Sequence, residues 1–189
     1  MVRRNISTQP LARRRPSAPA ALIPFVIAFV ALTSPAEAQE TELRSQVRHW
    51  LETTCGVGDE SVQPLSLREL GTGAVPLFIE AFDAGPDVGV IGEASAAAAR
   101  RFARIEVLLG EGQSFGLSQA DLETLKGTQR GEFIGQAVDD LIFKYGDAAL
   151  RAVRIIDGSD SRRFLQRVAE NDASPHAETA RALLREMRG

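Results

Sequence analysis

The sequence predicts an all-α protein. Apolar residues recur every three or four positions through most of the chain, which is the pattern of helices that bury one face. Glycines that can end helices, and Ser, Asp and Pro residues that can start them, separate these stretches. We find no pair of segments that alternates apolar and polar residues as paired strands do. Two helical arrangements remain open: stacked helical hairpins or an irregular helical bundle.

Four helices are expected in the first half of the chain. The first contains Trp50 and ends near Gly56, a short one ends at Gly71, a third spans 74–84, and a long one runs from about Glu93 to Leu109 after a Gly- and Pro-rich break at 83–92. Their apolar faces are formed by Leu43, Val47, Trp50 and Leu51; by Val75, Phe78, Ile79 and Phe82; and by Ala94, Ala98, Phe102, Ile105 and Leu109.

The second half begins with three glycines between residues 110 and 117, a candidate hinge. Ser118 and Asp121 have the spacing of a capping box, which starts a short helix. The strongest apolar stripe runs from Phe133 to Tyr145, and Gly146 is expected to end that helix. Further helices are expected over 148–156, over about 160–170, and after Ser174.

Two stretches resemble HEAT-type helical repeats. Leu67-Arg-Glu-Leu-Gly71 followed by Ala74-Val-Pro-Leu-Phe-Ile-Glu-Ala-Phe82 resembles the family's pattern of a helix, a glycine turn and a second helix opened by Ala-Val-Pro. The segments 141–156 and 164–184 echo it more loosely, and the stretch 110–131 departs from it. The resemblance implies stacked helix pairs that serve as a protein-binding scaffold.

Residues 1–38 are predicted to be a secretory signal peptide. A leader with five arginines and no acidic residue precedes an apolar run from Ala20 to Leu32, and Ala36-Glu-Ala38 then fits a signal-peptidase site. The apolar run would extend only about 20 Å as a helix, which is short for a membrane span. We therefore expect cleavage before Gln39, a periplasmic or secreted domain at 39–189, and no membrane attachment after cleavage. The alternative is an uncleaved segment that anchors the protein. The sequence leaves the general secretory and twin-arginine routes both open.

The net charge and the cysteine content limit the functions and partners to be expected. Residues 1–38 hold five of the 22 basic and one of the 25 acidic residues, so residues 39–189 carry a net charge near −7. This argues against nucleic acid as a partner, because phosphate binding needs clustered Lys and Arg. Cys55 is the only cysteine and is expected to be buried as a small apolar residue.

No motif for catalysis, a metal or a cofactor stands out. His49 and His176 lack the spacing of zinc ligands, and both fit ordinary helix-surface positions. The segments Gly71-x-Gly73 and Gly110-x-Gly112 follow helices, whereas the dinucleotide-binding fingerprint follows a strand. The sequence thus predicts no catalytic residue, metal or cofactor.

The functional expectation is a periplasmic adaptor or scaffold that binds another protein. With the apolar faces turned inward, Glu80 and Asp83 on one helix and Arg151 and Arg154 on another point outward as candidate partner-binding residues. The arginines at 100, 101 and 104 are expected to form ion pairs within the protein. The alternative is a helical domain with a pocket for a small ligand or an enzymatic reaction.

Overall fold

The computed structural model describes residues 35–57, 65–113, 116 and 118–187, all within one compact unit at Ser34–Gly189. These residues form eight α-helices and one 3-10 helix and contain no strand, which confirms the all-α prediction. The elements are α1 (Pro35–Thr54), α2 (Leu67–Leu70), η1 (Thr72–Ala74), α3 (Val75–Ala84), α4 (Val88–Gly110), α5 (Gln119–Gly127), α6 (Arg130–Ile156), α7 (Ser159–Glu170) and α8 (Ala177–Glu186). The predicted apolar leader lies outside the described residues.

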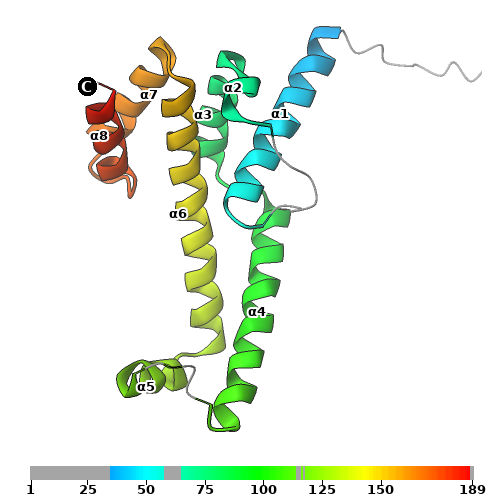
Figure 1. Ribbon diagram of the computed structural model, residues 1–189, viewed down its shortest axis with the longest axis vertical. Coiled ribbons are helices and arrows are strands. Elements are labelled where there is room, and N and C mark those ends of the chain that lie inside the picture. The colour runs from blue at the N-terminus through cyan, green and yellow to red at the C-terminus, as the bar shows by residue number, and fades with distance from the viewer. Residues whose placement is uncertain (1–34, 58–64, 114–115, 117, 188–189) are drawn as a thin grey trace, which may run out of the picture. The chain divides into compact units, whose positions relative to one another are not determined.

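The C-terminal half of α6 is the central helix of the bundle. In Figure 1, α1, α2 and α3 lie on one side of it, and the α7–α8 hairpin lies on the other. We call this region the head. Its core is continuous across these helices. Residues with no more than 2% exposure include Val47, Leu51, Ala74, Phe78, Ala149, Leu150, Val153, Leu165 and Ala180.

The N-terminal half of α6 leaves the head together with α4 (Figure 1). We call this antiparallel pair, residues 94–110 and 130–141, the stalk. Only Ala98, Phe102 and Leu141 are buried in it, and they are separate from the core of the head. Phe102 contacts Phe133 across the pair, with ring centroids 5.4 Å apart. Two helices can cover only one side of each other, so most of the remaining stalk residues stay partly exposed.

Local signals in the sequence explain several helix starts. Ser66 and Glu69 form a reciprocal capping box at α2. The Asp87 carboxylate accepts a hydrogen bond from the Gly89 amide at the start of α4, and the Ser118 hydroxyl accepts one from the Asp121 amide at α5. The helix α4 therefore begins at Val88, earlier than the expected Glu93, because the cap at Asp87 outweighs two glycines in the first turns.

The prediction that Gly146 ends a helix is wrong. The helix α6 continues through it without a break for 27 residues. A Cβ atom at Gly146 would lie 2.5 Å from Nε2 of His176, so the missing side chain makes room for the segment before α8. That segment also differs from expectation, because α8 begins at Ala177 and Ser174 belongs to the turn before it.

Candidate functional site

A groove in the head is the strongest candidate for a binding site. It has a volume of about 360 Å³ and lies where α1, α3, the start of α4 and α6 meet. Its apolar walls are formed by Val47, Leu77, Ala81, Ala84, Pro86 and Val88. The volume falls near the lower end of the range for ligand pockets, about 300–1,000 Å³, so the groove suits a small group.

Tyr145 contributes an uncharged polar group to this groove. Its side chain comes from α6 and is only 4% exposed, yet its hydroxyl makes no hydrogen bond with any described residue. Burial, with a smaller contribution from the nearby Glu52 carboxylate, raises the pKa of Tyr145 to about 12. The phenol therefore stays protonated near neutral pH and can donate a hydrogen bond.

Two ion pairs border the groove. Arg44 and Arg48 lie one turn apart on α1; Arg44 binds Glu80 of α3, and Arg48 binds Asp87 at the start of α4, with 3.2 Å between nitrogen and oxygen. Each arginine is thus offset by a carboxylate, and the rim has no net charge. Sequence reasoning missed this site because an apolar stripe does not reveal that the hydroxyl of Tyr145 would lack a partner.

The four predicted partner-binding residues all form ion pairs within the chain. Glu80 binds Arg44, and both carboxylate oxygens of Asp83 accept hydrogen bonds from Arg167 of α7, at 3.0 and 3.1 Å. Arg151 binds Asp147 one turn earlier on α6, at 2.7 Å, and Arg154 lies 3.6 Å from Glu186 of α8. Three of these pairs join different helices. Only Glu80 borders the groove, and no ion pair brings the acidic and basic members of the set together.

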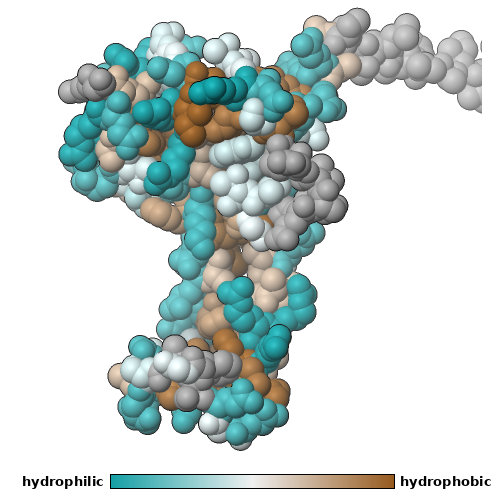
Figure 2. Space-filling view, viewed as in Figure 1, coloured by the Kyte–Doolittle hydropathy of each residue, from teal (hydrophilic) through white to brown (hydrophobic). Residues whose placement is uncertain are grey.

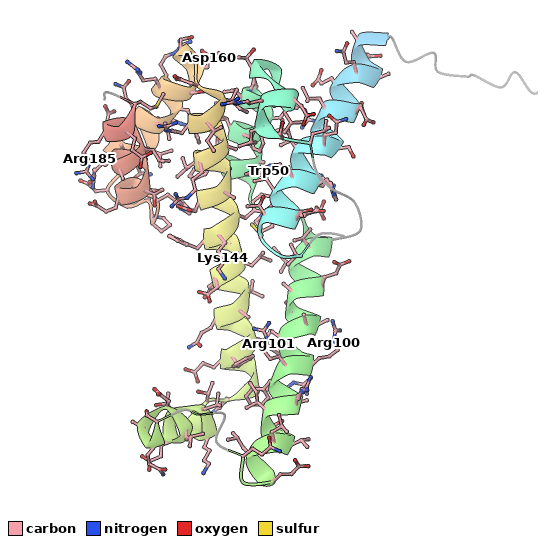
Figure 3. The ribbon with its side chains drawn as sticks, viewed as in Figure 1. Trp50, Arg100, Arg101, Lys144, Asp160 and Arg185 are labelled. Carbon is pink, nitrogen blue, oxygen red and sulfur yellow. The ribbon has the colours of Figure 1, made fainter. Side chains whose placement is uncertain are left out.

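The interactions of three arginines on α4 differ from those expected. Arg100, Arg101 and Arg104 are exposed and form no ion pair with a described residue. Figure 3 shows Arg100 and Arg101 on different sides of α4. The expected pairing within the protein is therefore not found among the described residues.

Cys55 is partly buried at the end of α1. This burial raises the pKa of its thiol to about 11, while Lys144 nearby acts weakly in the opposite direction. Since only the thiolate is strongly nucleophilic, a raised pKa makes a poor nucleophile.

We predict that Cys55 reacts slowly with a thiol reagent at pH 7.5 in the native protein and rapidly after denaturation in urea, because unfolding restores an ordinary thiol pKa. Absorbance-monitored labelling with a disulfide reagent measures both rates. Equal rates in the two states, or a dimer that dissociates on reduction, would contradict this prediction.

His176 is buried, although the sequence favoured a surface position. It is 7% exposed, stacks on Phe143 with ring centroids 4.8 Å apart, and meets Phe82 edge-on. Its Nδ1 atom has no hydrogen-bond partner among the described residues. Burial lowers the pKa of His176, and the nearby Asp147 carboxylate offsets part of this effect. The imidazole is therefore held in its neutral form.

The stability of the protein should fall in mild acid because of His176. Its pKa is lower in the folded state than in the unfolded chain, where it is about 6.5. The stability that this difference provides is fully present above about pH 6.5 and is lost as the pH falls through that value toward the lowered pKa. Urea unfolding from pH 8 to pH 5 should show a steeper loss for the wild type than for His176→Gln. Parallel curves would contradict the assignment.

The described residues offer no other obvious chemistry. They contain no group of three or more His, Cys, Asp or Glu side chains placed to hold a metal ion. No helix among them combines the length and the apolar character needed to cross a membrane.

Comparison with known proteins identifies no relative of this chain. No protein-family model, no curated protein and no solved structure matches the chain. The resemblance to HEAT-type repeats therefore rests on the sequence pattern alone.

Proposed function

We propose that this chain is an exported adaptor that binds another protein of the cell envelope. One observation carries the proposal: among the described residues, five of the six exposed large apolar side chains lie on α4 and α6. They are Val88, Val107, Ile142, Phe143 and Ile155. These side chains are spread along the two helices, and Val107 is the member that lies in the stalk. Apolar side chains that stay exposed are found at surfaces that bind proteins.

The form of the stalk supports this role. Figure 2 shows apolar side chains along the line between its two helices and again at the end near α5. The helix α5 contains no buried residue. Ile105, Leu108, Ile134 and Val138 are only partly covered, which leaves apolar area for a third helix to bury.

The head would act as the scaffold in this proposal. The helices α2 and α3 and the α7–α8 hairpin pack on opposite sides of α6. The sequence resemblance to HEAT-type repeats favours a scaffold role for these helices. Export follows from the predicted signal peptide, and cleavage before Gln39 would retain the buried residues Val47 and Leu51 of α1.

Site-specific photocrosslinking in the producing cell tests the proposal. A photoreactive phenylalanine analogue at Val107 or Ile142 should give adducts with a second protein, whereas the same analogue at the exposed Arg163 of α7 should give few. Equal adducts at all three positions would indicate nonspecific collision. Adducts of exactly two copies of this chain would indicate self-association, and either result would overturn the adaptor proposal.

Charge reversal of Glu80 and Asp83 should weaken capture of the crosslinked partner, more at low salt than at high salt, since their charges contribute mainly to encounter rate and specificity. The double variant Glu80→Lys, Asp83→Lys loses two surface ion pairs, each worth about 0.2–1 kcal/mol, so the fold should persist. Affinity capture at two salt concentrations measures the effect.

A matched control separates the surface charge from the ion pairs. Adding Arg44→Glu and Arg167→Glu restores both pairs with opposite polarity. If capture recovers in this fourfold variant, Glu80 and Asp83 serve the fold and do not contact the partner.

The groove favours the alternative function, a small-ligand-binding domain, because it combines apolar walls with one unpaired hydroxyl. Native mass spectrometry of protein purified from the producing cell tests this alternative. A small molecule retained in stoichiometric amount would support it.

A further inference from the structure

The groove beside Tyr145 has features that specify what kind of group it can hold. It is open to solvent on one side, and it is lined by residues of α1, α3, α4 and α6 and by Pro86 in the connection between α3 and α4. Removing apolar surface from water is the main driving force available there. An apolar side chain of modest size therefore fits the walls better than a charged group does.

The hydroxyl of Tyr145 adds a directional requirement. It is a protonated donor near neutral pH, and no described residue accepts its hydrogen bond. The residue as a whole is 4% exposed, but its hydroxyl is not among the fully buried atoms that lack a partner, so it remains in contact with solvent. A ligand that covered this hydroxyl without supplying an acceptor would leave it buried and without a partner, which is unfavourable, so a ligand that supplies an acceptor binds better. A carbonyl oxygen is such an acceptor.

The charges at the rim decide against an anionic ligand. Arg44 is paired with Glu80 and Arg48 with Asp87, so a carboxylate entering the groove would meet two carboxylates as well as two guanidinium groups. A neutral amide avoids this repulsion and can still hydrogen-bond to either member of a pair. Charge complementarity therefore favours an uncharged, amide-containing group.

We propose that the groove binds an apolar side chain of a peptide segment, with an adjacent backbone carbonyl accepting a hydrogen bond from the Tyr145 hydroxyl. This inference rests on the proposed adaptor function and gives the head a second point of contact with the partner, besides the stalk. The walls provide affinity for the side chain, and the phenol fixes the position of the peptide backbone.

The test uses N-acetyl-L-leucinamide as the probe, titrated into the isotope-labelled full mature protein and followed by NMR. Saturable chemical-shift changes are expected at Val47, Ala81 and Val88. Tyr145→Phe should weaken binding about 2- to 10-fold, the range expected for one hydrogen bond. Ala84→Trp should abolish binding, because Ala84 is exposed at the edge of the groove and a larger side chain there would fill it.

Two comparisons complete the design. Ala103→Trp, at an exposed position of α4 that does not line the groove, should bind the probe as the wild type does. N-acetyl-L-leucine, which carries a carboxylate, should bind no more tightly than the amide. Tighter binding of the acid, no saturable shift, or an equal response in Tyr145→Phe would each overturn the inference.

The outcomes separate this inference from the proposed function. If Val107 or Ile142 crosslinks to a partner but the probe does not bind, the adaptor proposal stands and the groove assignment fails. If the probe binds but no partner is captured at the stalk, the adaptor proposal fails, and the groove assignment then loses the partner on which it rests. A tightly retained small molecule in the groove would replace the peptide with the alternative ligand class.

Discussion

Replacing Gly146 with alanine is expected to lower the free energy of unfolding by about 1–3 kcal/mol, the usual cost of overpacking a core. The added Cβ would lie 2.5 Å from Nε2 and 2.8 Å from Cε1 of His176. That ring cannot move aside freely, because it is stacked on Phe143 and packed against Phe82. The clash should outweigh the gain of about 0.5–1 kcal/mol that alanine normally gives over glycine within a helix.

Gly135→Ala is the matched control for this prediction. Gly135 lies in the same helix, and a Cβ there would meet nothing within 4 Å, so only the gain in helix propensity remains. Urea unfolding of both variants should shift the midpoint in opposite directions. The double variant Gly146→Ala, His176→Ala should recover part of the loss. Stabilisation by Gly146→Ala alone would show that the C-terminal segment does not pack against α6 as described.

Phe78→Ala is expected to have the largest effect of any single substitution considered, about 3–5 kcal/mol of lost stability. Phe78 is 0% exposed in the core of the head, where its ring meets Trp50 edge-on at a centroid distance of 5.6 Å. Removing the ring leaves a cavity between α3 and α1 and ends this aromatic contact.

Val107→Ala is the comparison for Phe78→Ala. Val107 is 61% exposed on the stalk, so its truncation should change the stability by no more than about 0.5 kcal/mol. Thermal or urea unfolding followed by circular dichroism measures both variants. Similar losses at the two positions would contradict the division between a well-packed head and an open stalk.

The sequence predicted most elements of the head from local chemistry. The glycine that ends α2 and the boundaries of α3 follow from signals within a few residues. Val75 and Phe78 are buried as expected, and Ile79 and Phe82 are partly buried. These predictions succeeded because capping and helical periodicity depend on neighbours along the chain.

The errors of sequence reasoning have a common cause. The sequence predicts a helix end at Gly146 and a surface position for His176, and both predictions are wrong. These residues lie 30 positions apart in the sequence, and each explains the other: the glycine leaves space that the imidazole fills. A single sequence contains no local signal for such a contact.

The candidate groove also combines features that the sequence predicted with contacts that it could not predict. Periodicity predicted that Tyr145 lies on an apolar helix face and that Glu80 lies on an outward face. The sequence could not show that Glu80 pairs with Arg44 at the edge of a groove that Tyr145 also lines. The sequence by itself determined the all-α class, because each helix carries its own apolar period and its own start and stop signals. Only the tertiary structure decided which charged side chains form ion pairs, at which glycine another segment packs closely, and which hydroxyl lacks a hydrogen-bond partner. These contacts join residues that are far apart in the sequence and meet only when the helices pack.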